Sequence, residues 1–255
     1  METRTQISPK IQLLGSIAIY AIFVVVTLIL KPADDAPATR HFIAAAGGFV
    51  LGAALAYCSW QLGNGFLRNT KIKVGGLKPA GKIAQTILFA LLLLLLIIIA
   101  ARNLPAVFSA APLVAANTAL FASTAALFEE TLVRGLMLCA FLQLWARSKN
   151  RILLAALASS ILFGLMHLAN LAFAPPTAVV QQVFYAAVFG LVFSALYVRT
   201  QKLIFPIAAH FLVDFQPAIS SGISPSQAQW WQTLIAFVPI ALAALITLWH
   251  YDQSD

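Results

Sequence analysis

Five ionisable side chains of this chain lie inside runs of sequence that are otherwise apolar. They are Glu129, Glu130, His167, His210 and Asp214. Arg134 lies in the same stretch as the two glutamates, ALFEETLVRGLML at residues 126–138. Carboxylates and imidazoles are the groups that most often move protons in catalysis. Any one of these side chains alone could be a hydrogen-bonding contact between helices, but the whole set favours a functional site.

Helical geometry predicts different tasks for the two neighbouring glutamates. Glu130 and Arg134 are four residues apart, on one helix face and in the order that favours an ion pair. Glu129 is rotated from Glu130 by about 100° and is the poorer partner for Arg134. We therefore predict that Arg134 holds Glu130 ionised as a structural pair, and that Glu129 points elsewhere as a general base.

The same four-residue spacing occurs in two other apolar runs. Phe163 and His167 share a face in ILFGLMHLAN, and His210 and Asp214 share a face in IAAHFLVDFQPAI. These pairs bring one or two polar groups from each run to the same side of a helix. We expect all three runs to turn these faces toward the interior of a helix bundle.

Depth in the membrane provides a test of whether these groups can meet. Glu129 is eighteen residues from Arg147 and His167 is sixteen from Arg151. At a rise of ~1.5 Å per residue, both lie roughly 25 Å from the inner basic flank. His210 and Asp214 lie only roughly 12 and 18 Å from Lys202 by the same count. The sequence therefore predicts a tilted seventh run, or one kinked at Pro206.

The composition of the chain predicts a membrane protein. Its 255 residues are 61% hydrophobic and only 9% charged, and its mean hydropathy is +0.90. No soluble domain of this size can bury so much apolar surface. The apolar runs are continuous instead of alternating every second residue, which excludes a β-barrel. The net charge of +8 comes from basic residues between the runs, so we expect contact with the lipid bilayer and no nucleic-acid partner.

The apolar runs suggest an all-α bundle of about eight transmembrane helices. They lie near residues 11–30, 41–62, 83–101, 114–146, 152–172, 177–198, 203–219 and 229–249. With the N-terminus inside, twelve of the sixteen Lys and Arg residues fall in inner segments, three in outer loops, and Arg134 within a run. This asymmetry predicts an N-in/C-in orientation. No internal repeat is visible, so residues 1–255 are expected to form a single integral membrane domain.

Three short motifs resemble those of one family of membrane proteins. EETLVR fits Glu-Glu-x-x-x-Arg, FGLMH fits Phe-x-x-x-His, and HFLVD fits His-x-x-x-Asn/Asp, in that order on three separate runs. This arrangement resembles the CPBP family, the group of type II CAAX prenyl endopeptidases and their bacterial bacteriocin-processing and self-immunity relatives. The resemblance covers the motif-bearing core, roughly residues 114–218.

The resemblance implies an intramembrane endopeptidase that acts on a membrane-associated protein or peptide, in a bacterial inner (cytoplasmic) membrane. Glu129 and His167 would activate a water, and His210 and Asp214 would stabilise the oxyanion. Glu130, Arg134 and Phe163 would support them.

The last motif position departs from the form that ends in Asn. Asn can donate a hydrogen bond to an oxyanion, whereas an ionised aspartate only accepts. We therefore expect Asp214 either to be protonated or to orient His210 so that the imidazole donates.

The catalytic type leaves two alternatives. The family has been described both as metal-dependent and as glutamate-dependent, and its implied mechanism leads us to favour the type without a cofactor. If the chain binds zinc, Glu129, His167 and His210 would be the ligands, with a water in the fourth position.

Two other functions fit the same buried residues. One is a non-catalytic scaffold or immunity protein of the same fold, and the complete set of motif residues argues against it. The other is a proton-coupled transporter, in which Glu129 and Asp214 would relay protons. Transporters usually show two matching halves, and the sequence shows none.

Overall fold

The computed structural model describes residues 7–33, 35–63, 72, 74–216 and 229–254, and every regular element among them is helical. The elements are α1 (Pro9–Leu30), α2 (Ala38–Leu62), α3 (Pro79–Phe108), α4 (Pro112–Glu130), η2 (Thr131–Met137), α5 (Leu138–Leu144), α6 (Arg151–Met166), η3 (His167–Ala172), α7 (Pro176–Thr200), α8 (Ile204–Asp214) and α10 (Trp230–Asp252). The all-α prediction is therefore confirmed for the part of the chain that is described.

Proline and left-handed residues set several helix boundaries. The helices α1, α3, α4 and α7 each begin with a proline, at a position where a missing backbone donor costs nothing. Gln201 adopts a left-handed conformation, with φ of 58°, and ends α7. Asp252, the last residue of α10, accepts hydrogen bonds from the backbone N–H groups of Ile152 (2.7 Å) and Leu153 (2.9 Å). The C-terminal helix thereby caps the start of α6, the helix that leads to His167.

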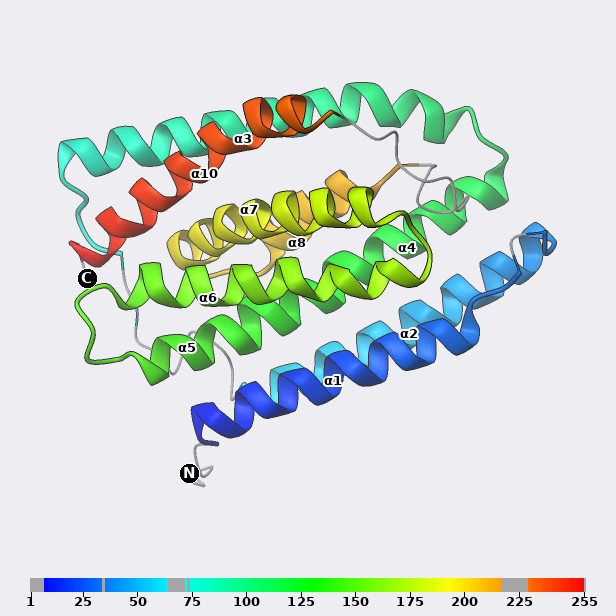
Figure 1. The fold of residues 1–255 in the computed structure, drawn as a ribbon, viewed down its shortest axis with the longest axis horizontal. Coiled ribbons are helices and arrows are strands. Elements are labelled where there is room, and N and C mark those ends of the chain that lie inside the picture. The colour runs from blue at the N-terminus through cyan, green and yellow to red at the C-terminus, as the bar shows by residue number, and fades with distance from the viewer. Residues whose placement is uncertain (1–6, 34, 64–71, 73, 217–228, 255) are drawn as a thin grey trace.

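Six of the described helices are long and apolar enough to cross a membrane, namely α1, α2, α3, α6 with η3, α7 and α10. The chain is therefore a polytopic helical membrane protein, as predicted. The fourth predicted run is divided among α4, η2 and α5, and α8 spans 11 residues, or roughly 16 Å. The number of crossings and the N-in/C-in orientation stay predictions. Figure 1 does show that α1 begins and α10 ends at the same end of the bundle.

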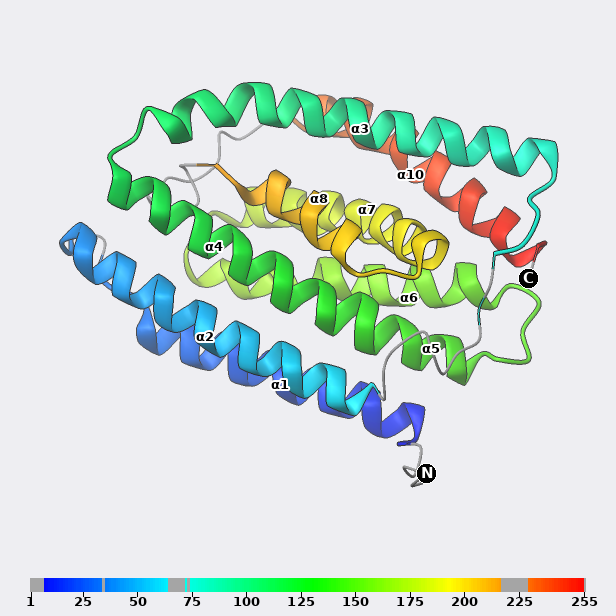
Figure 2. The ribbon, with the colours of Figure 1, turned by 180° about the vertical axis from the view of Figure 1, so that it is seen from behind.

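The helices form a layered bundle with the motif-bearing helices inside. The α1–α2 hairpin lies on one side and the α3–α10 pair on the other, with α4, α6, α7 and α8 between them (Figures 1 and 2). All residues from Thr131 to Leu142 are buried, whereas α1 and α3 expose many large apolar side chains. The most buried part of the chain therefore follows the two glutamates directly.

Three predicted runs differ from regular α-helices at the functional motifs. The fourth changes to a π-helix at Thr131, directly after Glu130, and the fifth tightens to a 3₁₀-helix at His167. The seventh ends as a helix at Asp214, and residues 217–219 of that predicted run lie outside the described residues. Such departures mark places where side chains compete for backbone groups, and π-turns inside helices frequently occur at functional sites.

Candidate active site

Glu130 and Arg134 form the ion pair that their spacing predicts. Arg134 Nη1 donates to Glu130 Oε1 over 2.9 Å, and both side chains have 0% exposure. Two opposite charges that are buried away from water attract each other strongly. Removing one partner leaves the other as an unpaired buried charge, which destabilises the protein. The pair therefore stabilises the fourth run only while both partners are present.

Two aromatic rings complete the surroundings of Arg134. Its guanidinium lies 4.5 Å from the centroid of the Phe163 ring and 5.4 Å from that of Phe193. Arg134 Nε and Nη2 and Glu130 Oε2 have no hydrogen-bond partner among the described residues. The ring faces are electron-rich and attract the cation, so they partly replace the missing partners.

His210 connects α8 to the glutamates of α4. Its Nδ1 lies 2.8 Å from Glu130 Oε1, and its Nε2 lies 3.2 Å from Asp214 Oδ2. Its Nε2 also lies 3.9 Å from Glu129 Oε2. Each short contact needs one proton, carried either by the ring nitrogen or by the carboxyl group. The imidazole is therefore held through both ring nitrogens, by the fully buried carboxylate of Glu130 and by the more exposed carboxylate of Asp214.

This geometry adds a role for Glu130 that the sequence analysis missed. Glu130 accepts from Arg134 and contacts His210 through the same oxygen, Oε1. Glu130 and His210 are 80 residues apart in the sequence, so helical spacing cannot predict their contact. Phe193 was missed for a similar reason. Its ring stacks on His210 with centroids 5.8 Å apart, and it is one of 18 phenylalanines in an apolar chain.

The depth mismatch predicted for His210 does not arise in the structure. Residue counts from flanking cations assume that those cations lie in one plane. In Figure 2, α8 runs alongside α4 at a similar slant, and this packing brings His210 level with Glu130. Pro206 lies in the first turn of α8, where it removes no helical hydrogen bond, so no kink is needed.

The end of α6 fixes the orientation of His167. The backbone N–H of His167 donates to the carbonyl oxygen of Gly164, three residues back, as in a 3₁₀ turn. The carbonyl oxygen of Phe163 is thereby left to accept a hydrogen bond from His167 Nδ1–H, over 2.9 Å. Because a carbonyl oxygen can only accept, Nδ1 carries the proton and the neutral ring presents Nε2 as an acceptor.

Phe163 lies between the two histidines. Its ring meets His167 edge to face at 5.1 Å and His210 at 6.0 Å between centroids. The carboxylate of Glu129 is within electrostatic range of both histidines and of Asp214. The structure thus brings the predicted site residues of α4, α6 and α8 into one cluster around this ring.

Exposure within the cluster follows a gradient. The side chains of Glu130 and Arg134 are sealed, that of His210 is 8% exposed, and those of Glu129 and Asp214 are 18% and 24% exposed. His167 is half-buried. Glu129, Asp214 and His167 therefore lie on the accessible side of the cluster, and the supporting pair lies on its buried side.

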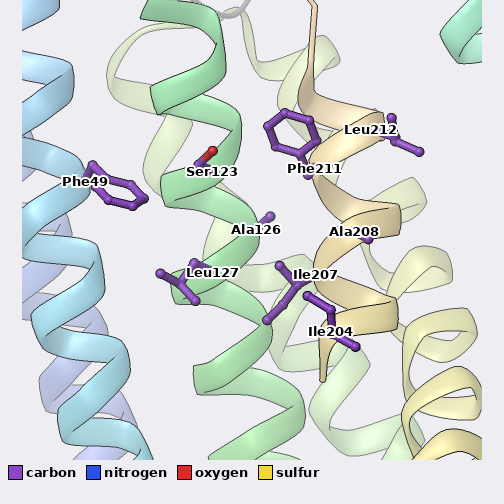
Figure 3. A pocket seen from close by; sticks show the side chains of 9 residues that line it. All are labelled: Phe49, Ser123, Ala126, Leu127, Ile204, Ile207, Ala208, Phe211 and Leu212. Carbon is purple, nitrogen blue, oxygen red and sulfur yellow. The ribbon is translucent and has the colours of Figure 1, made fainter. Parts of the chain in front are cut away.

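An apolar groove of about 500 Å³ lies between α2, α4 and α8 (Figure 3). Leu127 of α4 and Ile207 and Phe211 of α8 line it, and Phe49 of α2 points in from the opposite side. Its walls belong to the two helices that present Glu129 and His210. Ser123 contributes the only side-chain oxygen among the residues that line it.

The zinc alternative requires Glu129, His167 and His210 to converge on one point as ligands. Among the described residues, no three His, Cys, Asp or Glu side chains are arranged so that they could hold a metal ion. His210 already contacts carboxylate oxygens through both ring nitrogens. The carboxylates and imidazoles of the cluster can take up and release protons, as acid–base catalysis requires.

The fold and the cluster define a polytopic helical membrane protein with a carboxylate–histidine site inside the bundle. Residues 90–216 match the family model described as type II CAAX prenyl endopeptidase Rce1-like. The chain therefore carries an Rce1-like domain of the CPBP family, a family of proteases, and the resemblance of the three motifs is confirmed. The match begins within α3 and includes all the predicted site residues. No curated protein and no solved structure matches the chain.

Proposed function

We propose that this protein is an intramembrane endopeptidase that hydrolyses a peptide bond of a membrane-associated protein or peptide. The observation that carries the proposal is the junction at His210, which contacts Glu130 and Asp214 and lies 3.9 Å from Glu129. Membership of a protease family supports it independently.

Glu129 and His167 activate the water in this proposal. Glu129 has the exposure that a general base needs, and His167 Nε2 offers a second acceptor for the same water. The carboxylate takes one proton while the oxygen attacks the scissile carbonyl carbon. That proton then passes to the departing amide nitrogen, so the products are a new carboxyl terminus and a new amine.

His210 and Asp214 stabilise the oxyanion of the tetrahedral intermediate. The contact of Nε2 with Asp214 places this aspartate where it can orient the ring, whichever of the two groups carries the proton. Glu130 fixes the far side of the ring by its contact with Nδ1. The single proton of Nε2–H can be shared between Asp214 and an oxyanion that develops beside it, and the ring stays fixed through Nδ1 meanwhile.

The supporting residues hold these groups in register. Arg134 keeps Glu130 in place, and Phe163 separates the two imidazoles while it covers Arg134. Their task is to keep the reactive groups within a fraction of an ångström of a productive geometry, because small displacements reduce rates strongly.

The test compares peptide termini in membranes from cells that express the wild-type chain or Glu129→Gln at matched levels. Asp35→Asn makes the same chemical change at an exposed residue between α1 and α2, and serves as the control. We expect new termini with the wild type and with Asp35→Asn, and none with Glu129→Gln. Identical termini in all three membranes would contradict the proposal and favour a scaffold.

A further inference from the structure

The first helix contacts the site although it lies outside the residues that match the family. The Tyr20 hydroxyl donates to the carbonyl oxygen of Met166, and the Phe23 ring stacks on Phe128 with centroids 4.1 Å apart. Tyr20 and Phe23 are three residues apart and share one face of α1. Met166 directly precedes His167, and Phe128 directly precedes Glu129. One face of α1 thus supports both members of the proposed water-activating pair.

The Met166 carbonyl lies at the junction of two helix types. It belongs to the last residue of α6, and the 3₁₀-helix η3 begins at the next residue, so its backbone partner is the weaker i→i+3 bond of a 3₁₀ turn. A carbonyl oxygen has two lone pairs, and the Tyr20 hydroxyl donates to the second. A return of this turn to regular α-helix would move the Met166 carbonyl, so the Tyr20 hydroxyl opposes any rearrangement of the turn that orients His167.

A second contact ties α1 to the other end of η3. The ammonium of Lys31 lies 4.5 Å from the centroid of the Phe173 ring, and Phe173 is the residue that follows η3. The segment that begins with His167 is therefore held by α1 at both of its ends. Within the described part of the chain, these contacts join a helix near the N-terminus to a segment about 140 residues later.

We propose that Tyr20 is a positioning residue for His167, an inference that rests on the proposed function. Its hydroxyl is also within electrostatic range of Glu129, the other member of the pair. Tyr20 acts through the backbone of Met166 and is not itself assigned to touch the substrate.

The attachment of α1 to the bundle does not depend on Tyr20. The side chain of Gln12 is buried and donates to the carbonyl oxygen of Leu62 over 3.2 Å, and it accepts from Gln143 over 3.4 Å. Phe23 and Ile19 add apolar contact with the core. Removing one hydroxyl should therefore leave α1 in place while the turn at His167 changes. That difference separates a positioning role from a merely structural one.

The first measurement reads His167 directly, and it needs no substrate. The full chain is labelled with ¹⁵N in its four histidine rings and reconstituted in phospholipid nanodiscs. A His167→Gln variant assigns the His167 signals. We expect Tyr20→Phe to move the ring-nitrogen shifts of His167 and to leave those of His41 and His250 unchanged.

The matched control is Tyr251→Phe. Tyr251 lies on α10, away from the site, and is buried, whereas Tyr20 is partly buried; the Tyr251 hydroxyl likewise makes one hydrogen bond, which it donates to Gln85 over 3.1 Å. We expect this variant to leave the His167 shifts unchanged. Unchanged His167 shifts in Tyr20→Phe, or equal changes in both variants, would overturn the positioning role whether or not the chain is a protease.

The second measurement follows the rate of a Glu129-dependent cut, with a synthetic peptide copied from the site that the comparison of termini identifies. Tyr20→Phe should lower kcat about 10- to 100-fold, the range typical of residues that orient a catalytic group, with KM unchanged. In a His167→Gln background it should lower kcat no further. An additive effect, or a change in KM alone, would contradict the inference while leaving the proposed function standing.

Discussion

At the scale of residues, the site depends on a histidine held between carboxylates. His210 contacts Glu130 through Nδ1 and Asp214 through Nε2, at 2.8 and 3.2 Å. Glu130 also binds Arg134, so one buried carboxylate holds a side chain of α8 and a side chain of η2. The two contacts at Glu130 can be separated experimentally because only one of them involves a proposed catalytic residue.

The first prediction concerns Glu130 and Arg134. Arg134→Met alone leaves the buried Glu130 without its cation and should lower the free energy of unfolding by about 3–5 kcal/mol. The double variant Glu130→Met with Arg134→Met removes both charges, and should recover most of that loss. Its activity should stay low, because position 130 then has no oxygen that can hold His210. Thermal unfolding in detergent and the rate of the Glu129-dependent cut measure the two effects.

The contradicting outcome would be a double variant that recovers both stability and activity. In that case Glu130 would serve only the ion pair, as its spacing with Arg134 alone suggests. The contact with His210 would then have no catalytic consequence.

The second prediction concerns Asp214. Asp214→Asn keeps an oxygen that can accept from His210 Nε2, and should retain activity within about 10-fold of the wild type. Asp214→Leu has a similar size and no acceptor, and should lose about 100-fold. The rate of the same cut measures both. Equal losses in the two variants would mean that the negative charge of Asp214 is needed, and not its capacity to orient the ring.

At the scale of elements, four groups of the proposed site lie where a regular helix ends or changes, whereas His210 lies within α8. Glu129 and Glu130 end α4 before the π-turn, His167 begins η3, and Asp214 ends α8. At such points some backbone N–H and C=O groups lose their helical hydrogen-bond partners. The Phe163 carbonyl, which orients His167, is one of these groups. The close packing of α6 against α7 must also be kept, because α6 carries Phe163 and α7 carries Phe193.

The third prediction tests this packing. A Cβ at Gly164 would lie 2.6 Å from the carbonyl oxygen of Val183, which is backbone and cannot turn away. Gly164→Ala should therefore push α6 from α7, destabilise the protein by about 1–3 kcal/mol, and reduce activity. Gly48→Ala is the control, since a Cβ there meets nothing within 4 Å. Equal stability of the two variants in thermal unfolding would show that the α6–α7 contact can relax.

The sequence predicted more of the helices than of their ends. Long apolar runs and prolines located the described helices, because lipid leaves few other structures for such runs, although α3 continues to Phe108, seven residues past the predicted 101. The π-turn after Glu130 and the 3₁₀ turn at His167 were not predicted, since the apolar pattern does not change at either place. The ion pair of Glu130 with Arg134 was predicted because it is local, whereas the contacts of His210 with Glu130 and of Tyr20 with Met166 join distant segments.

At the scale of the whole molecule, an interior polar cluster is surrounded by helices that face lipid. The α1–α2 hairpin and the α3–α10 pair flank the motif-bearing helices on opposite sides (Figure 1). The matched residues 90–216 include the central helices and part of α3, but neither α10 nor the hairpin that contains Tyr20 and Phe23. The proposed positioning contacts thus come from a helix outside the matched residues.

The fourth prediction concerns orientation. The placement of Lys and Arg predicts that both ends of the chain face the cytoplasm. A fluorescent protein that folds only in the cytoplasm should therefore be bright when fused after Asp255, and alkaline phosphatase fused there should be inactive. A fusion within residues 32–37, between α1 and α2, should give the reverse pattern. The same pattern at both positions would contradict the predicted topology.

The most direct test of the central claim is hydrolysis by the purified full chain in nanodiscs, in water enriched with ¹⁸O. The substrate is the synthetic peptide copied from the Glu129-dependent cut. The account predicts one ¹⁸O atom in the new carboxyl terminus for the wild type, and no cut peptide with Glu129→Gln. Cutting by Glu129→Gln at the wild-type rate would contradict it.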